Sequence, residues 1–198
     1  NDAYLEAIAR IPAGEAVDEM IDQLKPHLDK NDIIIDLGNS NYQDTIRRTK
    51  QFKNFIGSGV SGGEEGALHG PSLMPGGDLK AYKQIAPIFE KIAAKDFQNK
   101  PCVTHIGIDG AGHFIKTIHN GIEYAVMQLI AETYDIYRKT YKLPAPEIAK
   151  IFQDYNRGKL KSYLIEITAK VLSHKDNLTN DYTINKILDK AGQKGTGT

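Results

Sequence analysis

The sequence predicts an α/β domain with a parallel sheet, followed by an all-α domain. In residues 16–106, short apolar runs alternate with stretches of helical periodicity, an order typical of parallel sheets. From residue 111 onward only helical patterns occur. The first of them runs for roughly thirty residues without a proline, far above the usual helix length of about 12. We therefore expect one domain at residues 1–109 and an all-helical domain at residues 110–198.

The first predicted elements are two helices around a buried strand. Residues 16–28 carry apolar side chains at helical spacing, namely Val17, Met20, Ile21 and Leu24. Residues 32–37 are nearly continuously apolar, as in a strand that is covered on both faces. Polar residues 38–41 end this strand as a turn, and a helix from about residue 43 to residue 53 is expected to follow.

A glycine-rich stretch interrupts this order. After a brief strand at Phe55–Ile56, residues 57–77 hold 8 glycines and 2 prolines, and we expect no regular structure there. Asp78 is expected to cap a helix that runs to about Lys95. Residues 102–106 predict one more strand.

The second half is expected to contain helices only. The long helix covers residues 111–141 and ends before two prolines in residues 143–146. Shorter helices are predicted at residues 147–155, 162–172 and 183–191.

The composition excludes several classes of function. In this 198-residue chain, 25 Lys plus Arg balance 25 Asp plus Glu, so no net charge attracts nucleic acid or a membrane surface. No apolar run approaches the ~18 residues of a membrane span, and no signal peptide pattern is present. The single cysteine, Cys102, excludes an intrachain disulfide and suits a reducing compartment. We expect a cytoplasmic protein, and we expect that both ends have been cut from a longer chain.

Residues 57–62 (GSGVSG) match the dinucleotide-binding pattern G-x-G-x-x-G. That pattern requires a helix that opens at its last glycine and receives the pyrophosphate. Because Gly63, Gly66 and Pro71 follow at once, we expect no helix and reject this interpretation. A loop that offers backbone N–H groups and the Ser61 hydroxyl to an anion fits better. A plain surface loop is the alternative.

The long helix presents polar side chains that are suited to acid–base chemistry. At about 100° per residue, Lys116, Asn120 and Glu123 share one face. The opposite side is expected to pack on a core through Ile118, Ile122, Ala125, Leu129 and Ile136. A glycine in a helix costs ~1 kcal/mol relative to alanine, so Gly112 and Gly121 indicate close approach of a backbone or a ligand. Without this signal, a solvated face with ordinary charge pairs would be the simpler interpretation.

Four stretches resemble signature sequences of the 6-phosphogluconate dehydrogenase family. They are residues 33–40 (IIIDLGNS), 57–77 (GSGVSGGEEGALHGPSLMPGG), 110–132 (GAGHFIKTIHNGIEYAVMQLIAE) and 192–197 (GQKGTG). The second and third are long and specific, and the resemblance extends over essentially the whole chain. It implies part of a Rossmann-type domain, followed by the beginning of the family's all-helical domain.

The resemblance implies a role for each matching residue. The family's general base matches Lys116, its general acid matches Glu123, and Asn120 is expected to hold the reacting oxygen. The substrate contacts match Asn39, Ser61, Gly62, Gly63, His119, Asn120, Tyr124, Lys194 and Thr196. The last two lie in a phosphate-binding segment. Asn39 is also expected to contact the cofactor, and the family's cofactor segment aligns with Ile11, Pro12 and Ala13.

The implied reaction is oxidative decarboxylation of 6-phosphogluconate to ribulose 5-phosphate and carbon dioxide, a step of the pentose phosphate pathway and of gluconate utilization. NADP would accept the hydride, with NAD as the alternative, and the family works as a homodimer. Lys116 must be neutral to accept a proton, so partial burial is expected to lower its pKa from ~10.4. No metal is expected, because His113 and His119 are six residues apart instead of four.

The chain departs from the family's pattern in ways that leave two alternatives open. It lacks the N-terminal glycine fingerprint, the basic residues that favour NADP over NAD, and the lysine of the cofactor segment at residues 11–13. The first alternative is a non-catalytic fragment. The second is a related β-hydroxyacid dehydrogenase for a small unphosphorylated hydroxy acid, against which Lys194 and Tyr124 argue.

Overall fold

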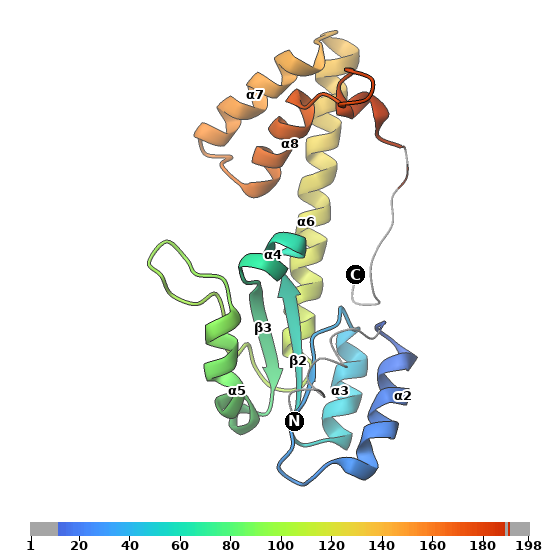
Figure 1. Cartoon of the computed structure of the whole chain (residues 1–198), viewed down its shortest axis with the longest axis vertical. Coiled ribbons are helices and arrows are strands. Elements are labelled where there is room, and N and C mark those ends of the chain that lie inside the picture. The colour runs from blue at the N-terminus through green and yellow to red at the C-terminus, as the bar shows by residue number, and fades with distance from the viewer. Residues whose placement is uncertain (1–11, 189, 191–198) are drawn as a thin grey trace. The chain divides into compact units, whose positions relative to one another are not determined.

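The computed structural model describes residues 12–188 and residue 190. These residues form two compact units, which divide between Gly121 and Ile122. The first unit contains the sheet and its helices, and every helix or strand given for the described residues of the second unit is a helix (Figure 1). The order of an α/β part followed by a helical part confirms the predicted fold class. The domain boundary between residues 109 and 110 stays a prediction.

The sheet of the first unit has three strands in the order β1-β2-β3, with β1 at Ile34–Asp36, β2 at Phe55–Ser61 and β3 at Ser72–Gly77. Strands β1 and β2 are parallel, as predicted, whereas β2 and β3 are antiparallel.

The prediction that residues 57–77 lack regular structure was wrong. This stretch contains most of β2, the short helix α4 at Gly63–His69 and all of β3. The glycines are compatible with strands here because β2 and β3 pair along six residues each, from Ile56 opposite Gly77 to Ser61 opposite Ser72. Backbone hydrogen bonds between the strands therefore stabilise the segment, although glycine has a low intrinsic propensity for β-strands.

Helices cover both faces of this sheet. Three lie at Glu15–Leu24 (α2), Tyr42–Gln51 (α3) and Leu79–Ile92 (α5), and a short 3₁₀ turn, η1, follows α2 at Lys25–His27. Figure 1 shows α2 and α3 on one side of the strands and α5 on the other. The predicted helices in this half are thus confirmed, although each differs by a few residues at its ends.

The alternation of strand side chains explains the two cores of this unit. Ile34 and Phe55 pack with the apolar face of α2, whereas their neighbours Ile35 and Ile56 pack with α5. Successive residues of a strand point to opposite faces, so one continuous apolar run supplies both layers. These four strand side chains are all buried.

Helix α5 begins where the sequence predicted. The Asp78 carboxylate accepts hydrogen bonds from the backbone N–H groups of Lys80 and Ala81, which satisfies two donors that a helix leaves open. In contrast, the strand predicted at residues 102–106 was wrong. Only isolated bridges join Val103 to Leu73 and Gly107 to Gly76, because the chain runs beside β3 without sustained pairing.

The second unit is built on the C-terminal part of α6, which spans Ala111–Asp135 and continues as a π-helical turn, η2, at Ile136–Thr140. Helices α7 at Ala145–Arg157 and α8 at Tyr163–Ser173 confirm two predicted helices. The prediction of a helix at residues 183–191 was wrong for the residues that can be compared, because only a 3₁₀ turn, η3, forms there, at Thr183–Lys186. Residues 189 and 191 lie outside the described residues.

The core of the second unit contradicts the predicted apolar stripe on α6. The packed residues of α7 and α8 contact Ile130, Tyr134 and Tyr137, whereas Ile122 and Leu129 are each 62% exposed. The remaining stripe positions Ile118, Ala125 and Ile136 are exposed as well. The prediction counted aliphatic residues and left out tyrosines, whereas Tyr134 of α6 and Tyr137 of η2 both pack against this core.

Candidate active site

The predicted base Lys116 lies where α6 touches the sheet most closely. Gly112, in the first turn of α6, leaves no room for a Cβ atom, because such an atom would overlap the carbonyl oxygens of Gly57 and Met74. A Cβ atom added at Gly59 would lie 2.5 Å from the Cβ of Lys116. The backbone of β2 therefore forms the surface from which the partly buried Lys116 side chain extends.

The end of β2 is linked to α6 by a short chain of polar side chains. The Ser61 hydroxyl lies 3.4 Å from His119 Nε2, and His119 Nδ1 lies 3.3 Å from the Asn120 side-chain oxygen. Asn120 is only 8% exposed although its side chain is polar. The structure thus brings Ser61 on the strand together with His119 and Asn120 on the helix. The two helix residues follow Lys116 by three and four positions.

Two glycines after β2 adopt backbone conformations that other residues rarely reach. Gly62 has φ +141° and Gly63 has φ +54°, both in the region that favours glycine. No atom lies within 4 Å of the position that a Cβ atom would take at Gly63, so the backbone there faces open space. Helix α4 does open at Gly63, which makes the expectation of no helix after residues 57–62 wrong.

The dinucleotide interpretation of residues 57–62 still fails, on different grounds. Gly57 and Gly59 lie inside β2 instead of in a turn at its end, and both face α6. A fingerprint glycine must lie in the turn where the backbone approaches the pyrophosphate. These glycines instead allow close packing between the strand and the helix.

Asn39 follows β1, at the edge of the sheet where parallel strands end. The turn that contains Asn39 is held by hydrogen bonds to the side chain of Asp36, which is 1% exposed. Asp36 accepts a hydrogen bond from the Gly38 backbone N–H at 2.9 Å and another from the Ser40 hydroxyl at 2.8 Å. The sequence contained a signal for this arrangement that we did not use: Asp36 is a carboxylate at the end of an otherwise apolar run.

A buried arginine connects this turn to α2. Arg48 of α3 is fully buried, and its guanidinium donates to Asp18 at 2.9 Å and to Asp36 at 3.4 Å. The hydrogen bond from Arg48 holds the pKa of Asp18 well below its usual range, and a bond from Arg47 adds to the effect. The pairing satisfies the charge of Arg48 where no water can reach it.

Other predicted site residues lie on the second unit or outside the described residues. Glu123 and Tyr124 follow Asn120 on α6, with Glu123 partly buried and Tyr124 45% exposed. Pro12 and Ala13 precede α2. The residues predicted as contacts that lie outside the described part of the chain are Ile11, Lys194 and Thr196.

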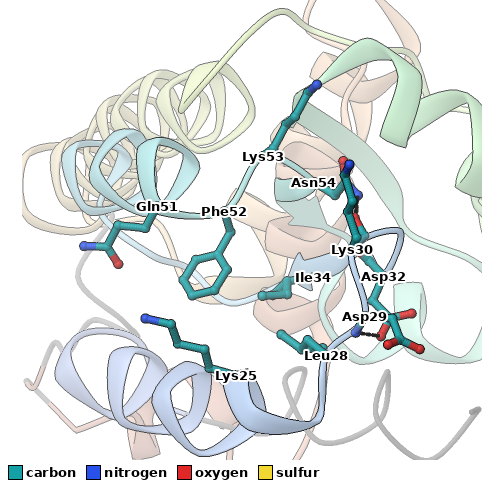
Figure 2. A pocket seen from close by; sticks show the side chains of 10 residues that line it. All are labelled: Lys25, Leu28, Asp29, Lys30, Asp32, Ile34, Gln51, Phe52, Lys53 and Asn54. Carbon is teal, nitrogen blue, oxygen red and sulfur yellow. Dashed lines mark hydrogen bonds between the residues drawn. The ribbon is translucent and has the colours of Figure 1, made fainter.

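A pocket lies at the opposite end of the sheet from Asn39 and Ser61. Figure 2 shows it between the amino ends of β1 and β2, with a volume of about 260 Å³ and Leu28, Ile34 and Phe52 among its lining residues. An apolar groove of about 340 Å³ lies in the second unit, between α6, α8 and η3. Neither contains a predicted site residue. Ligands of parallel α/β sheets bind at the carboxyl ends of the strands, so we place the site by Lys116.

Two further findings concern the described residues alone. Within residues 12–188 and 190, no set of three or more His, Cys, Asp or Glu side chains is grouped so that it could bind a metal ion. In the same part of the chain, no helix combines the length and the apolar character that a membrane span needs.

Comparison with known proteins identifies both halves of the chain. Residues 5–107 match the family model for the NAD binding domain of 6-phosphogluconate dehydrogenase, and residues 112–198 match the model for the C-terminal domain of the same enzyme. The first match alone covers more than half of the 198 residues.

Individual relatives agree with these matches. The chain is 56% identical over 192 residues to a decarboxylating 6-phosphogluconate dehydrogenase of Lactococcus lactis, and 56% identical over 191 residues to an NAD(+)-dependent one of Bacillus subtilis. Each comparison covers 94% of this chain and 41% of the relative. The chain therefore spans less than half the length of these relatives.

A solved structure supports the same relationship. The Plasmodium falciparum 6-phosphogluconate dehydrogenase, determined in its apo form and with NADP+ or 6-phosphogluconate, superimposes with a TM-score of 0.87 at 48% identity. That match covers 94% of this chain and 41% of the other. The 3-hydroxyisobutyrate dehydrogenase of Mycobacterium tuberculosis shares the fold at 19% identity, with a TM-score of 0.67 over 91% of this chain and 62% of the other.

Proposed function

Because the chain belongs to the 6-phosphogluconate dehydrogenase family, we propose that it forms part of an enzyme that oxidises and decarboxylates 6-phosphogluconate. One observation carries the proposal. His119 lies within 3.4 Å of Ser61 and 3.3 Å of Asn120, so the end of β2 and one face of α6 form a continuous polar surface beside Lys116. Such a surface can hold a hydroxylated, anionic substrate against a lysine base.

A nicotinamide cofactor, when bound, would supply the acceptor for the hydride that leaves C3 of the substrate. Asn39, in the turn fixed by Asp36, has the position and the amide group to contact its nicotinamide end. The described residues offer no glycine turn for the pyrophosphate, since Gly57 and Gly59 pack against α6. Among the described residues, those near Asn39 therefore fit the reactive end of the cofactor.

The chemistry requires a base first and an acid later. Lys116, neutral when the substrate binds, takes the proton of the C3 hydroxyl as the hydride departs, which leaves a 3-keto acid. This acid loses its C1 carboxylate as carbon dioxide, and the ketone oxygen accepts the electron pair together with a proton from Lys116. Glu123 then protonates C1 of the enediol, and the product is ribulose 5-phosphate.

The remaining residues would orient the substrate. We assign the C3 oxygen to Asn120 and His119, and the carboxylate end to Ser61 and the backbone of Gly62 and Gly63. The phosphate is assigned to Tyr124, Lys194 and Thr196. No metal is needed, because a β-keto acid can lose carbon dioxide once its ketone oxygen is protonated.

The cofactor and the assembly are proposals as well. We propose NADP, as in the Plasmodium falciparum complex, although the Bacillus subtilis relative is described as NAD(+)-dependent. We also propose that the natural protein is a cytoplasmic homodimer, as the family resemblance implies. Initial rates with 6-phosphogluconate and each cofactor in turn would decide the first point, and the molar mass in solution would decide the assembly.

The test replaces the base in the natural protein. Lys116→Met should lower kcat by about 10²–10⁴-fold while 6-phosphogluconate still binds, because this is the usual contribution of proton transfer by a positioned group. Lys139→Met is the matched control, since Lys139 is an exposed lysine of η2 that pairs with Asp135. Activity of the Lys116 variant within a few-fold of the parent, or equal turnover of gluconate without its phosphate, would contradict the proposal.

A further inference from the structure

His113 is a buried ionisable side chain three residues before Lys116 that the proposed reaction does not use. It lies in the first turn of α6 and is 1% exposed. Its Nδ1 atom is 2.7 Å from the Thr45 hydroxyl of α3. Its Nε2 atom has no hydrogen-bond partner among the described residues. Buried polar atoms are nearly always paired, so this nitrogen needs an explanation.

Room for the ring is built into the neighbouring strand. A Cβ atom at Gly57 of β2 would lie 2.9 Å from His113 Nδ1 and 2.5 Å from Thr45 Cγ2. Only glycine leaves space for the imidazole and the threonine together. His113 therefore fills a shaped site between β2 and α3, with its orientation set by one short hydrogen bond.

The environment of the ring determines which nitrogen carries the proton. Burial lowers the pKa of His113, and Arg48 acts in the same direction, while Asp36 and the backbone at Gly38 and Ser58 oppose the shift. The ring is therefore neutral at physiological pH. In a neutral ring only one nitrogen carries a proton: Nδ1–H can donate to the Thr45 oxygen, whose own hydroxyl donates to the Asn41 carbonyl at 3.3 Å, and Nε2 is then the unprotonated nitrogen.

These contacts connect the two segments that carry proposed active-site groups. Lys116 follows His113 by three residues, which is nearly one helical turn. Gly38 directly precedes Asn39 and is fixed by Asp36. The Thr45 hydroxyl, which lies 2.7 Å from His113 Nδ1, also donates to the carbonyl oxygen of Asn41 at 3.3 Å, two residues after Asn39. One chain of hydrogen bonds therefore joins α6 to the turn that carries Asn39.

We propose that His113 is a positioning residue: its hydrogen bond with Thr45, whose hydroxyl also donates to the Asn41 carbonyl, fixes the turn that carries Asn39 relative to Lys116. This inference rests on the proposed function, because it assigns His113 to the geometry of that reaction. His113 does not touch the reacting atoms in this account. Its effect is to keep the base and the amide at their productive separation.

The first experiment removes the Thr45 hydroxyl in the natural protein. Thr45→Val keeps the shape but not the hydrogen bond, whereas Thr45→Ser keeps the bond. We expect kcat to fall about tenfold in the valine variant with KM for 6-phosphogluconate changed less than threefold, and both values to stay within twofold in the serine variant. Equal kcat in the two variants, corrected for the folded fraction, would overturn the proposal. That result would assign His113 and Thr45 to folding alone.

The second experiment does not depend on turnover. In ¹⁵N-correlated NMR of the imidazoles, His113 should be a neutral ring at pH 7.5, because burial lowers its pKa. Its Nδ1 resonance should shift in Thr45→Val, which lacks the hydroxyl partner, and stay near the parent's in Thr45→Ser. An Nδ1 resonance that is the same in all three proteins, or a charged ring at pH 7.5, would overturn the proposal. If the parent protein fails to oxidise 6-phosphogluconate while His113 behaves as expected, the proposed function fails and the contact between His113 and Thr45 stands.

Discussion

Gly59 supports Lys116 directly: a Cβ atom added to this glycine would lie 2.5 Å from the Cβ of the lysine and 3.1 Å from the Gly112 carbonyl oxygen. Real Cβ contacts are longer than this, so any side chain at residue 59 must push α6 away from β2. The position of the proposed base along the sheet is therefore set by the absence of a side chain.

Gly59→Ala should lower kcat by about tenfold to a hundredfold, because a displacement of about 1 Å at a reacting group can cost 10²-fold in rate. Substrate affinity should change less, since Ser61, Gly62 and Gly63 lie on the strand side of this contact and keep their backbone positions. Steady-state kinetics and a binding isotherm for 6-phosphogluconate measure the two effects separately. Gly158→Ala is the control, because a Cβ atom there meets no atom closer than 3.7 Å. A Gly59 variant with the parent's kcat would show that the base is not positioned by this contact.

Glu123→Gln should separate the last proton transfer from the earlier steps. The amide cannot donate a proton to C1, so we expect steady-state turnover to fall by about 10²-fold or more while the first reduced cofactor still forms rapidly. Stopped-flow absorbance should show a burst followed by a slow phase. Glu132→Gln serves as the control, since the exposed Glu132 accepts a hydrogen bond from Gln128 on the same helix. A variant that loses the burst along with turnover would place Glu123 before decarboxylation instead.

The sequence predicted the order of elements well, because apolar periodicity reports burial directly. Residues 34–35 and 55–56 were recognised as strands because both residues of each pair are apolar, one for the core on each face of the sheet.

The prediction for the glycine-rich stretch failed for a physical reason. Local propensity treats Gly57 and Gly59 as breakers, whereas their role is to let α6 lie on the strand, a contact between segments more than 50 residues apart in sequence.

The candidate site shows the same limit. The shared face of Lys116 and Asn120 follows from helical spacing alone, but the link from His119 to Ser61 at 3.4 Å depends on how a strand and a helix meet. His113 was considered only as a metal ligand, since its spacing from other residues carried no other signal. Its burial and its contact with Thr45 arise from tertiary packing, which periodicity does not report.

Asp18→Asn should destabilise the fold in a pH-dependent manner. The pKa of Asp18 is lowered in the folded state, chiefly by the hydrogen bond from Arg48, so its contribution is complete above the unfolded value of 3.8 and is lost as the pH falls toward the folded value. Below pH 3.8 the unfolded chain binds the proton more readily than the folded one. We therefore expect a loss of about 2 kcal/mol at pH 7, which shrinks toward pH 3.

Denaturant unfolding of the parent and the variant at both pH values measures this difference. Asp44→Asn provides the comparison, because Asp44 is a 39% exposed partner of Arg47 at 3.4 Å, and its removal should change the free energy of unfolding by less than about 0.5 kcal/mol. A loss at Asp18 that is the same at pH 3 and pH 7 would mean that packing, and not the ion pair with Arg48, accounts for it.

The two glycines of α6 should respond in opposite directions to alanine. Gly121 has no atom within 4 Å of the Cβ position, so Gly121→Ala should raise the free energy of unfolding by about 0.5–1 kcal/mol through helix propensity. At Gly112 the new methyl group would overlap the backbone of Gly57, Met74 and Gly76, so Gly112→Ala should lower it by at least about 2 kcal/mol. Urea midpoints of the two variants, at unchanged slope, measure both effects. The sequence alone indicated close approach at both positions. Destabilisation by Gly121→Ala would mean that another part of the natural protein contacts residue 121. An unchanged free energy of unfolding in Gly112→Ala would contradict the close contact between α6 and β2, on which the position of Lys116 depends.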